Sequence, residues 1–167
     1  IEYYLDNGSL FSAAAFMRNI DNVIYADDST IDAGAFIDEY AGEQWTYTGF
    51  LNGSDGKFSG VELNTVFFAD DLIEGVGISA NVTFTDSEFK QANGETVGLP
   101  GTSDLIYNAA IFYEDYGISA RLNYSWRDKW ISPIEDPAEF WGEMERLDAQ
   151  ISYTFPSQIS GSEVSVY

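Results

Sequence analysis

Apolar and polar residues alternate most strictly in the segment 118–127, where every second residue is apolar. A period of two is typical of a β-strand with one apolar and one wet face. The segment 104–114 repeats the pattern less strictly, and the residues between the two segments form a short connection that contains glycine. The sequence therefore predicts a β-hairpin over 104–128. Its apolar row comprises Ile118, Ala120, Leu122, Tyr124 and Trp126.

The same alternation recurs along most of the chain. The arms of the hairpin are eleven or twelve residues long, which exceeds the usual globular strand and approaches the ~9–11 residues that cross a bilayer at a tilt. Three consecutive alanines blur the pattern near the N-terminus, so the apolar face of that strand is not evident. Further strands are predicted at 1–5, 9–20, 45–69 (with an interruption near 52–56), 77–89, 144–155 and 162–167.

The connections between these strands alternate in length. Short connections are expected at 6–8, 70–76, 115–117 and 156–161, and long loops at 21–44, 90–103 and 129–143. Short turns at one end and long loops at the other are typical of outer-membrane barrels. We therefore predict an all-β fold, an antiparallel up-and-down transmembrane β-barrel. A soluble β-sandwich with one wet face is the alternative, but the strand lengths and the sidedness of the loops favour the barrel.

Composition narrows the functional classes. The net charge of −21 (7 basic and 28 acidic residues) argues against nucleic acid as a partner, because nucleic-acid binding needs basic patches. The chain has no Cys and no His, which excludes disulfides, thiolate or histidine metal sites, and catalysis that relies on either residue. No cofactor or metal is predicted.

Acidic residues gather in the segment 21–44, which has seven of them and no basic residue. We interpret it as a solvated loop with one or two helical turns within 31–40. A calcium site is the sharper alternative, although no EF-hand spacing is present. The acidic pairs Asp70/Asp71 and Glu135/Asp136 suggest glycoside hydrolysis only superficially, because adjacent carboxylates point apart. We predict that the chain is not an enzyme.

Three stretches in succession resemble the barrel of TonB-dependent outer-membrane receptors. The first, 56–72 followed by 77–89, carries a G-x-x-x-G-x-E-like segment at Gly56, Gly60 and Glu62. The others are 98–130, similar to the family's run of loop, strand, turn and strand, and 147–155, similar to the following descending strand. The resemblance implies a barrel of about 22 strands with an N-terminal plug, in the outer membrane of a Gram-negative bacterium.

The resemblance also sets expectations about the whole protein. It implies TonB-dependent active uptake of a scarce nutrient: a ferric siderophore, cobalamin or an oligosaccharide. Residues 1–167 would form a partial barrel domain of about eight strands without plug sequence. The partners implied are outer-membrane lipid, the TonB system acting through the missing plug, a small-molecule nutrient and an associated surface lipoprotein. The alternatives are a secreted carbohydrate-binding β-sandwich, a plugless porin-like channel and a complete eight-stranded barrel.

Candidate site residues follow from these expectations. Outer loops would carry the substrate contacts Trp130, Phe140 and Trp141, since aromatic rings stack on sugars and flat chelates; packing or interfacial roles are the alternative. Lipid would lie beside Leu122 and Ile151. Interfacial aromatic girdles would comprise Tyr124, Trp126 and Trp130 near the loops, and Phe67, Tyr113, Tyr153 and Phe155 near the turns. Polar side chains expected to face the lumen, as substrate contacts, plug contacts or wetted wall, are Glu62, Asn64, Asn81, Asn108, Arg121, Asn123, Arg127, Asp148 and Gln150.

Overall fold

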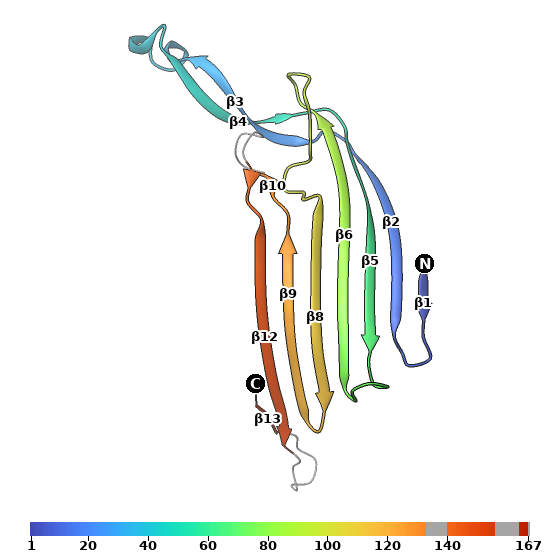
Figure 1. Cartoon of the computed structure of the whole chain (residues 1–167). Helices are drawn as coiled ribbons and strands as arrows, with labels where there is room; N and C mark the ends of the chain where they lie inside the picture. Colours follow the sequence, from blue (N-terminus) through green and yellow to red (C-terminus); the bar gives the residue numbers. More distant parts are fainter. Residues whose placement is uncertain (133–139, 156–163, 167) are drawn as a thin grey trace.

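The computed structural model describes residues 1–132, 140–155 and 164–166, and its main element is one antiparallel nine-stranded sheet (Figure 1). The strands are β1 (Glu2–Tyr4), β2 (Leu10–Ile20), β3 (Ile24–Asp32), β4 (Gln44–Asn52), β5 (Gly56–Phe68), β6 (Val76–Lys90), β7 (Thr96–Val97), β8 (Leu105–Asp115), β9 (Ile118–Arg127), β10 (Trp130–Ile131), β11 (Phe140–Trp141), β12 (Met144–Phe155) and β13 (Val164–Val166). The main sheet has the order β1-β2-β5-β6-β8-β9-β12-β13, with β7 paired to β6.

Register aligns the apolar residues of neighbouring strands into rows. Ile78 on β6 pairs with Ile111 on β8, and Ile111 pairs with Leu122 on β9. Leu122 in turn pairs with Ala149 on β12. Because directly paired residues point to the same side of a sheet, the alternation within each strand gives the sheet one mainly apolar face and one mainly polar face.

Short turns join the strands at one end of the sheet. Between β8 and β9, Tyr116 and Gly117 both have positive φ, at 50° and 75°. This is the backbone of a two-residue type I′ turn, whose twist matches that of paired strands. The Asp115 carboxylate accepts a hydrogen bond from the Tyr116 amide at 2.7 Å and fixes the first turn residue. The hairpin predicted over 104–128 is confirmed.

The segment 21–44, predicted as a long solvated loop, lies outside the main sheet and is mostly exposed, but it contains strand structure that the sequence did not predict. It forms most of a second hairpin, in which β3 and β4 pair over nine consecutive positions outside the main sheet (Figure 1). At the tip, two short 3-10 helices, η1 (Ala33–Ala35) and η2 (Asp38–Tyr40), account for the expected helical turns. Polar and apolar residues are mixed on both faces of this hairpin, so alternation does not mark its strands.

The single interrupted strand predicted over 45–69 is also wrong. The interruption is real, but β4 and β5 on its two sides belong to different sheets. Backbone hydrogen bonds from Gly53 to the Val23 carbonyl (2.7 Å) and from Val23 to the Ser54 carbonyl (3.3 Å) close the base of the β3–β4 hairpin there. The largest buried cluster of the described residues packs beside it and comprises Val23, Tyr25, Phe89 and Leu99.

The loop 90–103 contains the two-residue strand β7, and the described parts of 129–143 (129–132 and 140–143) contain the short β10–β11 pair. They lie at the same end as the β3–β4 hairpin, opposite the short turns (Figure 1). The predicted turn at 156–161 and the pair Glu135/Asp136 fall outside the described residues. Of the strand predicted over 162–167, the described part is β13, which pairs with β12.

The main sheet is open in the described part of the chain. Its path begins at β1 and ends at β13, and these two strands do not pair with each other. The all-β antiparallel class is therefore confirmed, whereas closure and the number of strands in a barrel stay predictions. A sandwich would need a second sheet over the apolar face, and among the described residues none lies there.

Candidate functional site

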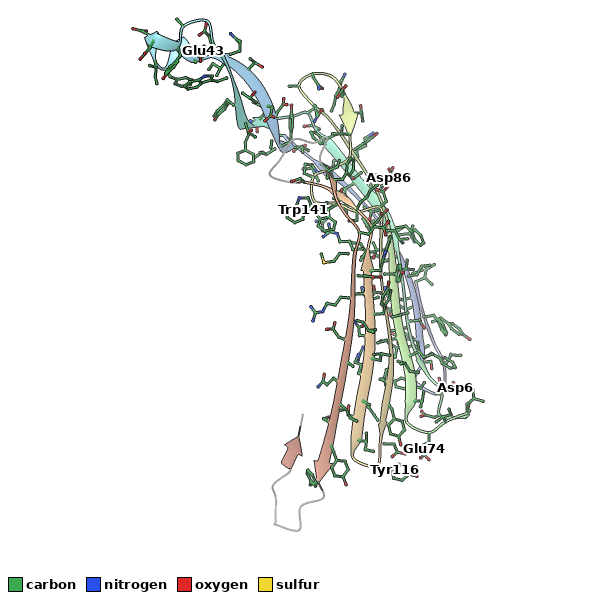
Figure 2. All side chains as sticks on the ribbon, turned by 60° about the vertical axis from the view of Figure 1, so that its left-hand side comes forward. Asp6, Glu43, Glu74, Asp86, Tyr116 and Trp141 are labelled. Atoms are coloured by element: carbon green, nitrogen blue, oxygen red, sulfur yellow. The ribbon has the colours of Figure 1, made fainter. Side chains whose placement is uncertain are left out.

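The two faces of the main sheet present opposite chemistry (Figure 2). On the apolar face, Leu122 and Ile151 are 44% and 67% exposed, so the side chains expected beside lipid are not sealed in an interior. On the polar face, register places all nine residues that the sequence marks for a lumen. That this face borders a lumen stays a prediction.

A cavity of about 210 Å³ lies on the polar face across β5, β6, β8 and β9. Three asparagines form one row of its wall, since Asn64 pairs with Asn81 and Asn81 with Asn108. The Asn108 amide donates to the Asn81 side-chain oxygen at 3.0 Å. The cavity brings together five of the predicted residues: Asn64, Asn81, Asn108, Arg121 and Asn123.

Arg121 is held in place at this cavity. Its Nη2 donates to Ser79 Oγ on β6 at 3.0 Å, so the side chain crosses over β8. Its Cζ lies 5.8 Å from the centre of the Phe112 ring, within the range of a cation–π contact. Sequence reasoning missed Ser79 and Phe112. Ser79 stands in the same alternation as Asn81, which is the signal that was available for it.

The other four predicted lumen residues lie on the same face but outside the cavity. Gln150 pairs with Arg121, and Asp148 pairs with Asn123. Asp148 already has a cationic partner, because Arg146 Nε lies 2.8 Å from its Oδ2. Glu62 lies beyond the asparagine row and Arg127 ends β9 at the loop side.

Two phenylalanines on the polar face cover glycines on the neighbouring strand. Phe16 on β2 pairs with Gly60, and Phe112 on β8 pairs with Gly77. A Cβ at Gly60 would meet the Phe84 carbonyl oxygen at 2.3 Å and the Phe16 ring at 2.5 Å. A Cβ at Gly77 would meet the Phe112 ring at 2.2 Å. Glycine is thus required where an aromatic ring lies across the strand.

The three predicted substrate-contact aromatics meet at the loop end. Trp130 pairs with Trp141 and Ile131 with Phe140, so that β10 and β11 bring both sides of the loop together. A cavity of about 260 Å³ lies beside Trp130 and Phe140 and is also lined by Asp86, Asp104 and Lys129. Phe140 and Trp141 are 55% and 46% exposed, which leaves ring surface for a ligand.

Trp130 differs from the other two because it is only 7% exposed. The Arg127 guanidinium lies 4.1 Å from the centre of its ring, and the Trp141 ring packs against it at 5.5 Å between centroids. Arg127 Nε also donates to Ser103 Oγ at 2.7 Å, and its Nη2 donates to the Gly101 carbonyl. An interfacial girdle role for Trp130 is therefore wrong, since the ring is buried under the loops.

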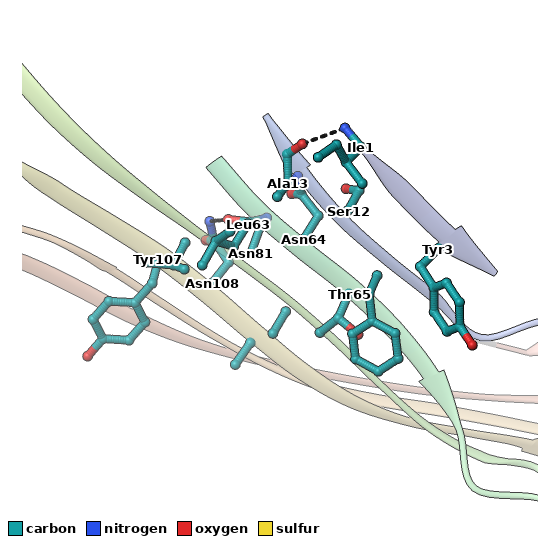
Figure 3. A pocket seen from close by; sticks show the side chains of 14 residues that line it. Ile1, Tyr3, Ser12, Ala13, Leu63, Asn64, Thr65, Asn81, Tyr107 and Asn108 are labelled. Atoms are coloured by element: carbon teal, nitrogen blue, oxygen red, sulfur yellow. Dashed lines mark hydrogen bonds between the residues drawn. The ribbon is translucent and has the colours of Figure 1, made fainter. Parts of the chain in front are cut away.

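The apolar face carries a different hollow, a groove of about 630 Å³ across β1, β2, β5, β6 and β8 (Figure 3). Small residues such as Ala80 and Ala109 line it beside larger ones such as Leu63 and Tyr107. Towards the loops, the Tyr107 and Trp126 rings stack at 5.2 Å between centroids. This groove is lined almost wholly by apolar atoms and holds no group for acid, base or metal chemistry.

Within the described residues no group of acidic side chains is arranged to hold a metal ion. The two helices among the described residues are single 3-10 turns, and neither is long or apolar enough to cross a membrane. At the hairpin tip, Asp32 Oδ1 accepts hydrogen bonds from the Gly34 and Gly42 amides at 2.8 and 3.0 Å. Those two bonds, that from Gly42 foremost, lower the pKa of the Asp32 carboxyl below its usual range.

Long antiparallel strands with one exposed apolar face, one polar face and short turns at one end define the class of the outer-membrane β-barrels. The family model described as "TonB dependent receptor-like, beta-barrel" matches residues 1–167. The chain therefore belongs to the TonB-dependent receptor β-barrel family, whose members are outer-membrane transporters of Gram-negative bacteria. No curated protein and no solved structure matches the chain.

Proposed function

We propose that this chain forms part of the wall of an outer-membrane transporter that takes up a scarce small-molecule nutrient with energy from TonB. The observation that carries the proposal is the two-faced sheet. Exposed apolar side chains such as Leu122 and Ile151 lie on one side of the same strands that carry amides and an arginine on the other. An apolar surface of this extent is stable when lipid covers it.

In this proposal the loop end captures the nutrient. Phe140 and Trp141 offer exposed rings beside a cavity that also contains carboxylates and Lys129. Rings of this kind stack on sugars and on flat chelates, which fits an oligosaccharide, a ferric siderophore or cobalamin. The nutrient then passes along the polar face. A surface lipoprotein that covers the loop end is compatible with the same arrangement.

A test uses the full-length receptor in its native outer membrane. Growth is measured on limiting ferric siderophores, cobalamin or oligosaccharides, in strains that have or lack the receptor and TonB. We expect growth on one nutrient class to require both. Growth that requires the receptor but not TonB would support a porin-like channel instead, and full solubility of the receptor in plain buffer would refute the membrane assignment.

The capture role of the loop end has its own matched control. The double variant F140A/W141A removes both exposed rings, whereas F155A removes a similarly exposed ring at the turn end. We expect the double variant to raise the half-saturating nutrient concentration about tenfold or more, as the loss of stacking worth about 1.4 kcal/mol implies. F155A should leave it unchanged, and equal effects of the two variants would refute the role.

A further inference from the structure

The cavity on the polar face contains a guanidinium group, that of Arg121, which no carboxylate neutralises among the described residues. In the part of the chain that the structure describes, no carboxylate lies within 4.0 Å of the Arg121 guanidinium. The two ion pairs found in this part of the chain are Lys57–Glu88 and Arg146–Asp148. Among the described residues Arg18, Lys90, Arg127 and Lys129 also lack an ion pair, but of these five basic residues only Arg121 lines this cavity. Within the same described ranges, the Arg121 guanidinium contacts the Ser79 hydroxyl oxygen and the Phe112 ring.

The Arg121 side chain is exposed, but one hydrogen bond directs it across the sheet. Its bond to Ser79 reaches from β9 to β6. In the register, Ala110 on β8 pairs with both Ser79 and Asn123, and Ala110 is buried. A small residue at that position leaves room for the guanidinium to cross. Holding the long side chain in this way lowers the entropy cost of binding a ligand.

The rest of the cavity supplies neutral hydrogen-bonding groups. Side chains of Asn64, Asn81, Asn108 and Asn123 line it together with Arg121, and an amide can donate while it accepts from another partner. Arg121 uses one of its five N–H donors on Ser79. Two acidic residues lie diagonally across from Arg121 in the register, Glu114 on β8 and Asp148 on β12; neither forms an ion pair with Arg121, and Asp148 is bound by Arg146.

We infer that this cavity is a subsite for a carboxylate group, bound by the Arg121 guanidinium and the surrounding asparagine amides. A planar carboxylate matches the paired N–H donors of a guanidinium. The volume of about 210 Å³ accommodates such a group with its neighbouring atoms. The inference rests on the proposed function, because it requires the polar face to border the passage. The carboxylate can belong to a transported solute or to a segment of the receptor itself that enters the lumen.

The test compares three variants of the full-length receptor in detergent, washed free of small molecules, by the midpoint of thermal unfolding. R121Q removes the charge, R121K keeps it, and R18Q removes an exposed arginine of the same face that lies outside the cavity. If the receptor's own carboxylate occupies the subsite, R121Q lowers the midpoint by several degrees and R121K restores most of it. R18Q then has little effect.

Packing alone is separated from charge by repeating the comparison at about pH 3, where ordinary carboxylates are protonated. The acidic groups on the same face of the strands that adjoin β9 are Glu114 on β8 and Asp148 on β12, and Glu62 lies on the same face farther away, on β5. The difference between wild type and R121Q should be clearly smaller at that pH if a carboxylate is the partner, because the arginine lowers the pKa of the paired carboxyl and part of its charge remains. A difference that persists unchanged at pH 3 would mean that Arg121 only packs on Phe112, and would overturn the inference.

If the carboxylate comes from a solute, the washed receptor shows no such difference at neutral pH. Citrate, used as the probe, should then raise the midpoint of wild type and R18Q but not of R121Q, and glucose should raise none. Equal midpoints for R121Q and R18Q, with no response to citrate, would refute the subsite. That outcome leaves membrane location and TonB-dependent growth unaffected. Failure of the subsite can therefore be distinguished from failure of the proposed function.

Discussion

The apolar and polar faces of the main sheet are built from the same strands, yet they obey different packing rules. On the apolar face large side chains such as Ile111 and Leu122 are exposed, and the groove of Figure 3 stays open between them. On the polar face side chains are tied to partners on other strands, as Asn108 is to Asn81 and Arg121 to Ser79. The difference is the one expected of a barrel wall in a membrane, where lipid chains cover one side and the protein satisfies its own polar groups on the other.

The largest expected effect comes from placing a charge at mid-strand on each face in turn, which tests whether the two faces have different surroundings. Leu122→Arg puts a guanidinium towards lipid, and Asn123→Arg puts the same group on the polar face one residue away. We expect Leu122→Arg to cost about 2–4 kcal/mol of folding free energy and Asn123→Arg less than about 1 kcal/mol. Urea unfolding of the full-length receptor in lipid vesicles measures both. Equal costs would contradict the assignment of the faces.

The polar face continues into the loops through Arg127, and cutting that link should have the next largest effect. Arg127→Met keeps much of the side-chain length but removes the hydrogen bonds to Ser103 and Gly101. Loss of charged hydrogen bonds should lower the local stability of the loops by about 1.5–3 kcal/mol. Amide exchange at Gly101, whose N–H bonds to the Ile131 carbonyl, reports the change. Arg146→Met, at an exposed ion pair, should leave that exchange rate unaltered.

Small increases in side-chain volume test whether the two faces differ in how tightly they are packed. Gly77→Ala on the polar face drives a Cβ into the Phe112 ring, and we expect a cost of about 1–3 kcal/mol. Adding Phe112→Ala removes the obstructing ring, so the cost of Gly77→Ala should fall sharply in that background. Ala80→Val, in the open groove on the apolar face, should be nearly neutral. A double-mutant cycle on urea unfolding tests all three expectations.

The smallest effect concerns Asp32, which lies outside both faces at the hairpin tip. Its folded pKa is lowered, so the unfolded tip binds the proton more tightly than the folded tip does. The stabilisation is therefore fully present above the ordinary aspartate pKa of about 3.9 and is lost as pH falls through the lowered value. Amide chemical shifts of Gly34 and Gly42 should titrate together at that lower pH, and Asp32→Ala should abolish the transition.

The sequence predicts the strands of the main sheet, whose two faces have different surroundings. It does not predict β3 and β4, whose two faces have similar surroundings. The bounds of β8, β9 and β12 agree with prediction to within one or two residues, because each has one predominantly apolar face. The β3–β4 hairpin stands clear of the main sheet (Figure 1), and both of its faces mix apolar and acidic residues. Asp28, for example, bonds to Thr48 across the strands at 2.6 Å. No difference in surroundings forces its residues to alternate.

The candidate site divides in the same way. Alternation within single strands is enough to assign Asn81, Asn108 and Arg121 to one face. It does not reveal that they share a cavity, because that depends on the register between strands. The roles of Ser79 and Phe112 depend on a side chain that crosses an intervening strand, which no local pattern encodes. Burial of Trp130 likewise depends on Arg127 folding over it.

The pair of hydrogen bonds that joins Val23 to Gly53 and Ser54 has a consequence for assembly. It returns the chain to β5 close to where β2 ended, so the β3–β4 excursion acts as a tight link between neighbouring strands. The entropy of closing that link then scarcely depends on how many residues the excursion contains. The length and the side chains of the β3–β4 hairpin can therefore change during evolution without altering the order in which the strands of the main sheet pair.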